Sequence, residues 1–404
     1  MTTQSDRRGY LLVTLCYWAF TLSDGALRML VLMHLHAQGQ TALALALILL
    51  PYEVAGVATN LLGGYLNARV GMKATLTLGL ALQVVACTML ASDPADMSVL
   101  FVAASQVLSG VAKDLAKTSA KSYVKALRTP GDSAGLFRWV AWMTGSKNAM
   151  KGAGFFVGGA LLSCAGFRAT NYGIAGLLAL FTCAAAWTLP RVPGRRGVTI
   201  GTVLSQDARM WWLSVARMFL FGSRDAWFAV ALPLFLIRSG WPQPAVGGAL
   251  AAWVILYGAI QSGTPRLTGA RTASAGTRWA LTWTWLLIAP LATGALALPS
   301  SARPVLIATL TLAAYGAVFA VTSSLHSWLV VALHDDDRSA ERVGFYYAAN
   351  AAGRVLGTLA SGWIFSVACT GVEGLAWCMH ASCLSAAAAA ACTAALRRRV
   401  ITTA

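Results

Sequence analysis

Charged residues interrupt stretches of this chain that are otherwise apolar enough to lie inside a membrane. Eight of them are basic: Arg28, Lys113, Lys117, Lys147, Lys151, Arg217, Arg224 and Arg354. Four are acidic: Asp24, Glu53, Asp114 and Asp225. One charge at bilayer depth costs about 2.5–3.5 kcal/mol on insertion scales, so it is rare unless it faces a polar interior and acts there. Because the bases outnumber the acids, these residues predict an interior that receives a negatively charged solute.

The densest group of bases lies in the stretch SGVAKDLAKTSAKSYVK. Lys113, Lys117, Lys121 and Lys125 follow one another at intervals of four residues, which places them on one broad face of a helix. We expect Lys113 and Lys117, beside Asp114, to bind the solute. Lys121 and Lys125 are nearer the helix end, and their ammonium groups are expected to snorkel to the membrane surface.

A second pair of lysines lies in the sequence TGSKNAMKGAGFF. Lys147 and Lys151 are one helical turn apart, with Asn148 between them. Two ammonium groups on one face repel each other, and a bound dianion relieves that repulsion. The pair is therefore a candidate clamp for a phosphate-like group. The alternative is that both lysines pair with carboxylates on other helices.

Two further Asp–Arg combinations lie in apolar stretches. Asp24 and Arg28 are four residues apart and are placed to form an ion pair within one helix. Arg224 and Asp225 are adjacent, so we expect them to point in different directions, with Arg224 reaching the solute and Asp225 pairing with another helix. Arg354 is a candidate for bidentate binding of an oxyanion. A purely structural ion pair is the alternative for each.

Five other polar side chains have two interpretations. Arg217 lies near the end of its apolar stretch, which favours a structural role over binding. Glu53 is a candidate proton carrier or a buried, paired glutamate. Asn60 and Gln261 can donate hydrogen bonds to a solute or bond neighbouring helices. His326 can exchange protons near neutral pH, although a single histidine without a partner motif favours a structural role.

The composition indicates that the stretches carrying these side chains lie in a membrane. Apolar residues make up 57% of the 404-residue chain and charged residues 11%, well below the roughly one quarter of charged residues in a soluble domain. A membrane-spanning helix needs about 20 mostly apolar residues. Twelve stretches qualify, near 10–33, 43–66, 74–91, 98–120, 137–164, 170–190, 209–236, 245–265, 278–298, 304–333, 341–369 and 372–396. The predicted fold class is an all-α membrane protein with twelve transmembrane helices.

The remaining basic residues predict the orientation in the membrane. With the N-terminus placed inside, twenty of them fall on cytoplasmic segments and only Arg168, Arg238 and Arg303 fall outside. This bias follows the positive-inside rule and predicts that both termini are cytoplasmic. It also accounts for most of the net charge of +17, so the charge does not indicate a nucleic-acid partner.

The spans divide into two halves. The longest hydrophilic gap separates six spans from six, and we predict a six-helix bundle over 1–190, a cytoplasmic linker over 191–208 and a second six-helix bundle over 209–404. Weak internal repeats support two pseudo-symmetric bundles. Asp24 and Asp225 each follow a phenylalanine by four residues at a spacing of 201, which also relates Asn60 to Gln261. Asn148 and Lys151 similarly resemble Asn350 and Arg354.

The sequence offers little support for enzyme chemistry. It lacks a Walker A loop and HExxH, GxSxG and CxxC motifs, and its hydrophilic loops are too short for a catalytic domain. The eight cysteines are dispersed and are expected to be small buried hydrophobic residues. We therefore predict no catalytic residue, no metal site and no cofactor.

The turn GYLNARVGMK resembles the cytoplasmic signature loop of the major facilitator superfamily. Gly64, Arg69, Gly71 and Lys73 match that loop, whereas Ala68 replaces its acidic residue and removes one expected contact between helices. The resemblance implies a transporter fold of two pseudo-symmetric six-helix bundles.

Four longer blocks resemble the ArsJ organoarsenical efflux permeases of that superfamily. They are YWAFTLSDGALRMLVLMHLH from Tyr17, SGVAKDLAKTSAKS from Ser109, GSKNAMKGAGFFVGGALL from Gly145 and LFGSRDAWFAVALPL from Leu220. The resemblance implies secondary active efflux of 1-arseno-3-phosphoglycerate, which a partner glyceraldehyde-3-phosphate dehydrogenase forms from arsenate, and hence arsenate resistance. It also implies a multi-pass protein of the bacterial inner membrane. Both ends of that ester are oxyanions, which bases and hydrogen-bond donors bind, whereas thiol clusters bind softer species.

The resemblance does not assign residues, so the site rests on the charges above. The residues expected to bind substrate are Arg28, Asn60, Lys113, Lys117, Lys147, Asn148, Lys151, Arg224, Gln261 and Arg354. Those expected to pair with the bases or to carry protons in an antiport are Asp24, Glu53, Asp114 and Asp225. The nearest alternative is an exporter of another phosphorylated organic anion. A membrane-embedded transferase acting on a phosphorylated lipid and a proton-driven exporter of cationic drugs fit the basic interior less well.

Overall fold

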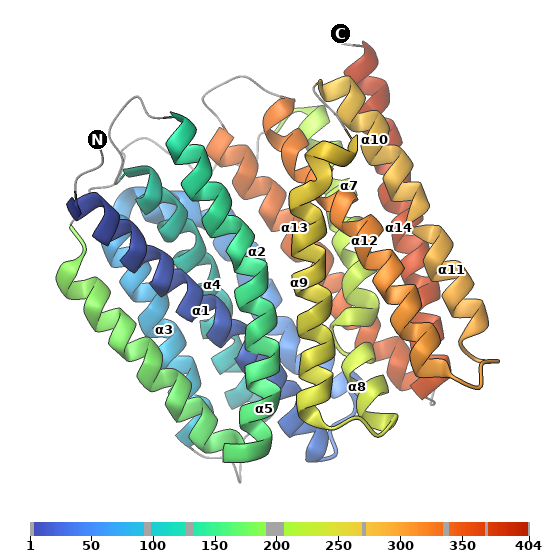
Figure 1. Ribbon diagram of the computed structural model, residues 1–404, viewed down its shortest axis with the longest axis horizontal. Coiled ribbons are helices and arrows are strands. Elements are labelled where there is room, and N and C mark those ends of the chain that lie inside the picture. Colours follow the sequence, from blue (N-terminus) through green and yellow to red (C-terminus); the bar gives the residue numbers. More distant parts are fainter. Residues whose placement is uncertain are drawn as a thin grey trace. The chain divides into compact units, whose positions relative to one another are not determined.

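The computed structural model describes residues 4–92, 98–126, 133–190, 206–268, 272–333, 339–367 and 371–402. These residues form helices joined by turns and contain no strand (Figure 1). The helices are α1 Gln4–Ala37, α2 Ala42–Val70, α3 Met72–Ser92, α4 Val99–Ala126, α5 Ser133–Thr188, α7 Ala208–Phe228, α8 Ala231–Arg238, α9 Gln243–Thr268, α10 Ala273–Leu286, α11 Ile288–Ala297, α12 Pro304–Ala332, α13 Ser339–Val367 and α14 Gly371–Thr402. The side chains of Arg69, Lys121 and Lys125 lie outside this description.

Helices occupy all twelve predicted spans. By length and composition, ten stretches of the described chain are able to cross a membrane. One of them, Ser146–Thr188, has 43 residues, enough for two crossings at roughly 20 residues each. Counting that stretch twice and adding α13 gives the predicted twelve. The all-α membrane fold expected from the apolar runs is confirmed.

Two long helices change direction at recognisable points. Gly166 divides α5 with φ 77° and ψ 173°, a left-handed conformation that glycine adopts without steric cost. The other break separates α7 from α8. There the backbone N–H groups of Val230 and Ala231 donate to Ser361 Oγ at 3.3 and 3.0 Å. The hydroxyl satisfies donors that the interrupted helix would leave unpaired in an apolar medium.

Contacts divide the chain into two compact units. Unit 1 comprises Met1–His34, Val54–Ile200 and Gln243–Val254, and unit 2 comprises Leu35–Glu53, Gly201–Pro242 and Ile255–Ala404. Each of α2 and α9 therefore contributes one half to each unit. The linker predicted over 191–208 lies mostly outside the described residues, so the division of the chain at that point stays a prediction.

Small residues let α1 approach α5 in unit 1. A Cβ added to Gly25 would lie 2.6 Å from the carbonyl oxygen of Lys151, and one added to Gly158 would lie 2.6 Å from the carbonyl oxygen of Ala26. No side chain fits in so short a space, so glycine permits this crossing. The crossing brings the polar residues of the two helices within reach of each other.

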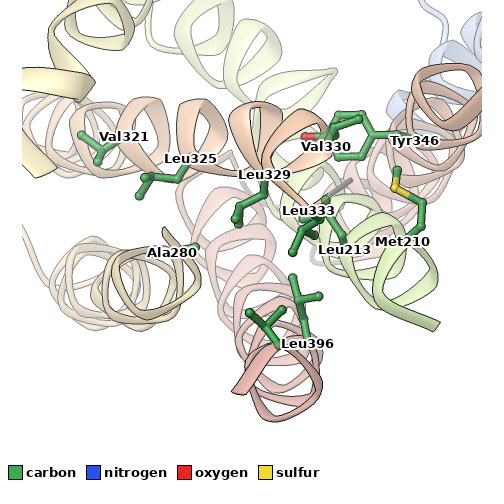
Figure 2. Close-up of a cluster of buried hydrophobic side chains, with 11 residues drawn as sticks. Met210, Leu213, Ala280, Val321, Leu325, Leu329, Val330, Leu333, Tyr346 and Leu396 are labelled. Carbon is green, nitrogen blue, oxygen red and sulfur yellow. The ribbon is translucent and has the colours of Figure 1, made fainter. Parts of the chain in front are cut away.

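Glycine likewise lets α7 approach α13 closely in unit 2. A Cβ at Gly357 would lie 2.7 Å from the carbonyl oxygen of Gly222 and 2.8 Å from Cβ of Asp225. Nearer the N-terminus of α7, this helix shares an apolar cluster with α10, α12, α13 and α14 (Figure 2). Its buried members are Met210, Leu213, Ala280, Val321, Leu325, Leu329, Val330, Leu333, Tyr346, Leu396 and Val400. The cluster fixes the helices that carry the polar residues of unit 2.

Candidate functional site

A charged cluster in unit 1 is built on α4. Asp114, whose side chain is 1% exposed, lies between two lysines of its own helix. Its Oδ1 is 3.1 Å from Lys117 Nζ, and its Oδ2 is 3.8 Å from Lys113 Nζ. Asn60 of α2 accepts a hydrogen bond from Lys117 Nζ at 3.1 Å. Two bases therefore share one buried carboxylate, as their positions on one helical face predict.

The close approach of α2 completes this cluster. A Cβ at Gly56 would lie 3.1 Å from Lys113 Nζ and 3.2 Å from Asp114 Oδ2. The Asn60 side chain is oriented by a hydrogen bond that its Nδ2 donates to the Gly56 carbonyl oxygen at 2.7 Å. The amide oxygen is thereby presented to Lys117, so Asn60 positions an ammonium group.

The α1–α5 crossing supplies a second group of charges in unit 1. Lys151 Nζ lies 3.6 Å from Asp24 Oδ2, and Asp24 is 6% exposed. Trp18 Nε1 donates to Ser146 Oγ at 2.7 Å, which fixes the register of the two helices. Asp24 therefore has a partner on α5, and its predicted ion pair with Arg28 on its own helix stays a prediction.

The predicted residues Arg28, Lys147 and Asn148 accompany this pair. All three side chains are half-buried. Arg28 follows Asp24 by one turn on α1, and Lys147 precedes Lys151 by one turn on α5. Unit 1 thus combines five of the basic residues with two acidic ones.

Unit 2 holds an extended chain of ion pairs. Asp225 Oδ1 lies 2.5 Å from Arg224 Nη2 and 2.6 Å from Arg224 Nε. Asp225 Oδ2 lies 3.2 Å from Arg354 Nε on α13. Arg354 Nη2 lies 2.5 Å from Oε1 of Glu53 on α2, whose side chain is fully buried. Two guanidinium groups and two carboxylates therefore alternate across α7, α13 and α2.

The geometry corrects one prediction for this chain. Adjacent helical residues were expected to point apart, yet Arg224 bends back and binds the carboxylate of Asp225 through two nitrogens. The long arginine side chain spans the roughly 100° that separates neighbouring residues on a helix. The predicted pairing of Asp225 with another helix is confirmed by Arg354.

A second polar group of unit 2 surrounds Arg217, a residue that the sequence analysis left out of the site. Arg217 is 4% exposed and donates from Nη1 to Ser323 O at 2.9 Å and to Ser323 Oγ at 3.0 Å. It also donates from Nε to Asn350 Oδ1 at 3.2 Å. Gln261 Nε2, a predicted site residue, donates to the same Ser323 Oγ at 3.3 Å. A signal was present, because Arg217 precedes Arg224 by seven residues, or two turns on one face.

Comparison with known proteins identifies the family to which the chain belongs. The sequence matches the family model of the Major Facilitator Superfamily over residues 10–358. The chain belongs to the major facilitator superfamily. The predicted resemblance of the loop at Gly64–Lys73 to that superfamily agrees with this match. No protein with a curated description matches the sequence significantly.

Solved transporters share the fold of this chain. A bacterial homologue of the human lysosomal transporter Spinster, inward-facing and unoccupied, superimposes with a TM-score of 0.75 at 13% identity over 98% of both chains. A mutant of the nucleoside transporter NupG gives a TM-score of 0.73 at 15% identity, over 96% of this chain and 99% of that one. A POT family transporter bound to 5-aminolevulinic acid gives 0.69 at 12%, over 94% and 95%. The protein is a multi-pass membrane transporter of the superfamily, and its substrate must be argued from its own residues.

Proposed function

We propose that the protein exports 1-arseno-3-phosphoglycerate across the inner membrane of a bacterium and thereby confers resistance to arsenate. A glyceraldehyde-3-phosphate dehydrogenase supplies this ester on the cytoplasmic side by using arsenate in place of phosphate. Both termini of the transporter face the cytoplasm in this proposal. The site residues are the ten polar and basic residues named from the sequence, with four carboxylates that pair with them.

The observation that carries the proposal is an excess of buried positive charge. Within unit 1, Lys113 and Lys117 share the single carboxylate of Asp114. Within unit 2, the carboxylates of Asp225 and Glu53 pair with Arg224 and Arg354. The hydrogen bonds of Arg217 go to neutral acceptors. Bringing a charge out of water is costly unless it is compensated, so an oxyanion is the solute that these groups stabilise most.

The type of base also suits this substrate. Arginine offers a planar fork that matches phosphate and arsenate, and lysine offers a compact charge with three donors. The carboxylates hold the bases in position while the site is empty and release them as the ester binds. Alternating exposure of the site to the two sides of the membrane then completes export.

Arsenate tolerance of a sensitive bacterium tests the proposal directly. Cells that carry this gene together with the dehydrogenase should grow at arsenate concentrations that stop cells carrying either gene alone. Tolerance conferred by the transporter without the dehydrogenase, or none with both genes, would contradict the proposal. A vesicle assay with unlabelled phosphoglycerate tests the alternative function. If phosphoglycerate competes with the labelled arsenate ester as well as the unlabelled ester does, the protein exports phosphorylated anions in general.

The same vesicles test the predicted clamp on α5. Lys147→Ala and Lys151→Ala should each lower the initial rate of ester transport by roughly tenfold or more, as expected when one partner of a buried charged contact is lost. Arg168→Ala is the matched control, because Arg168 is an exposed base of the same helix. Normal transport by both lysine variants would show that the clamp is wrong. Turnover of a phosphorylated lipid in detergent would instead favour a transferase.

A further inference from the structure

Arg217 differs from the other bases of unit 2 in the partners that hold it. Arg224 and Arg354 each contact a carboxylate, whereas the hydrogen bonds of Arg217 go to a backbone carbonyl, a hydroxyl and an amide oxygen. Among the described residues, no carboxylate lies within ion-pair distance of Arg217, and its Nη2 donates no hydrogen bond. An almost fully buried guanidinium therefore keeps an uncompensated charge and an unused donor.

Aromatic rings hold this guanidinium in a fixed plane. Its Cζ lies 4.2 Å from the centroid of the Phe221 ring and 5.0 Å from that of Tyr346. Cation–π contacts of this kind offset part of the cost of removing the guanidinium from water. Tyr346 belongs to the apolar cluster of unit 2 and is fixed by it (Figure 2). The fork is thus rigid before any ligand arrives.

Polar side chains of α9 and α12 converge next to Arg217. Ser323 Oγ receives Arg217 Nη1 at 3.0 Å and Gln261 Nε2 at 3.3 Å, and the Tyr257 hydroxyl lies 3.3 Å away. A hydroxyl oxygen accepts at most two hydrogen bonds. Arg217 and Gln261 fill both positions, so the donor that remains for the oxygen atoms of an anion is Nη2 of Arg217.

A second, independent observation points to a missing ligand. His326 follows Ser323 by three residues on α12, which places the two on the same face of that helix. The imidazole is 0% exposed, and neither ring nitrogen has a hydrogen-bond partner among the described residues. Buried polar groups almost always have a partner, so an unpaired histidine beside an uncompensated arginine is unusual.

We infer that Arg217, with Ser323 and Gln261 beside it, is a subsite of unit 2 for a tetrahedral dianionic oxyanion, the head group of a phosphate or arsenate monoester. This inference deepens the proposed function and rests on it for the identity of the full substrate. Arg217 is the specificity-determining residue, because its unused Nη2 offers two N–H donors to the oxygens of such a group. Ser323 and Asn350 are positioning residues.

Asn350→Asp is the decisive variant. It replaces the amide oxygen that lies 3.2 Å from Arg217 Nε with a carboxylate oxygen. A purely structural Arg217 would be held more firmly by this change, and ligand binding would stay the same. If Arg217 is the anion subsite, the new carboxylate compensates its charge, and anion affinity falls by roughly tenfold or more while the protein stays folded.

The measurement is a binding titration of the purified transporter with glycerol 3-phosphate and with glycerate, alongside its melting temperature. Asn350→Asp and Arg217→Gln should weaken binding of glycerol 3-phosphate, and glycerate, which has no tetrahedral dianion, should bind weakly to every variant. Gln38→Glu adds the same charge at an exposed site and is the control. Unchanged affinity in Asn350→Asp, or no saturable binding of glycerol 3-phosphate to the unmodified chain, overturns the inference. If cells with the gene tolerate arsenate but Asn350→Asp binds glycerol 3-phosphate as tightly as the unmodified protein, only the subsite is rejected. If the protein binds glycerol 3-phosphate but confers no tolerance to arsenate, only the proposed function is rejected.

Discussion

Arg354 Nη2 and Glu53 Oε1 lie 2.5 Å apart although 301 residues separate them in the sequence. The contact joins α13 to the half of α2 that belongs to unit 2. Arg354 also contacts Asp225, so its guanidinium bridges two buried carboxylates. Protonation of Glu53 would remove one of these two negative charges from Arg354. The geometry suits the proton-carrying role that the sequence suggested for Glu53.

Replacing Glu53 with glutamine tests that role. The amide keeps the shape of the side chain but cannot take up or release a proton, so efflux should no longer be accelerated by an imposed pH gradient. Exchange of labelled for unlabelled ester, which needs no gradient, should persist. Proteoliposomes with and without a gradient give both rates.

Asp207→Asn provides the matched control for this carboxylate. Asp207 caps the N-terminus of α7 through the Met210 N–H at 2.8 Å and is exposed, and asparagine caps a helix equally well. Its gradient response should match that of the unmodified protein. If Glu53→Gln also keeps the full response to the gradient, then Glu53 is a structural partner of Arg354 and the proton carrier is another group.

A second prediction concerns the carboxylate between two lysines. Asp114→Asn leaves Lys113 and Lys117 buried without their shared anion, and breaking such a contact typically costs about 3–5 kcal/mol. The melting temperature should therefore fall. An added oxyanion replaces the lost carboxylate, so glycerol 3-phosphate should raise the melting temperature of the variant more than that of the unmodified protein.

The control for Asp114 is Glu373→Gln, an exposed carboxylate in the first turn of α14. Its melting temperature and its response to glycerol 3-phosphate should be nearly unchanged. An equal stabilisation of Asp114→Asn and unmodified protein by the phosphate ester would mean that the anion does not reach these lysines.

A third prediction isolates the helix crossing from the charges. A methyl group at Gly154 would overlap the carbonyl oxygen of Leu22, so Gly154→Ala should push α5 away from α1. Overpacking of this kind costs about 1–3 kcal/mol. Gly173→Ala is the control on the same helix, since nothing lies within 4 Å of its added methyl group. A lower melting temperature for the first variant alone is expected, and equal values would contradict the crossing.

Much of the fold and of the charge pairing could be predicted from the sequence. Apolar runs of the length of a bilayer give the spans because the membrane leaves the backbone little choice but helix. The internal repeat related Asp24 to Asp225 and Lys151 to Arg354. The structure places Lys151 against Asp24 at 3.6 Å and Arg354 against Asp225 at 3.2 Å, so the repeat marks equivalent ion pairs.

The role of Arg217 could not be predicted in the same way. Its partners Ser323 and Asn350 come from α12 and α13, 106 and 133 residues further along the chain. Spacing within one helix reports which residues share a face, but it does not report which neighbouring helix supplies a neutral acceptor or a carboxylate. The prediction that Arg224 and Asp225 point in different directions was wrong for a related reason, since the conformation of a long side chain depends on its surroundings.

The two equivalent ion pairs should respond differently to exchange of their bases. Arg354 contacts Asp225 through Nε and Glu53 through Nη2, a geometry that one ammonium group does not reproduce, whereas Lys151 contacts Asp24 through a single nitrogen. Arg354→Lys should therefore lower the melting temperature and slow ester transport, while Lys151→Arg should retain most of both. Thermal unfolding in detergent and initial rates in vesicles measure the two effects. If Arg354→Lys transports at the normal rate, charge alone suffices at this position, and the alternating chain of guanidinium groups and carboxylates has no role in transport.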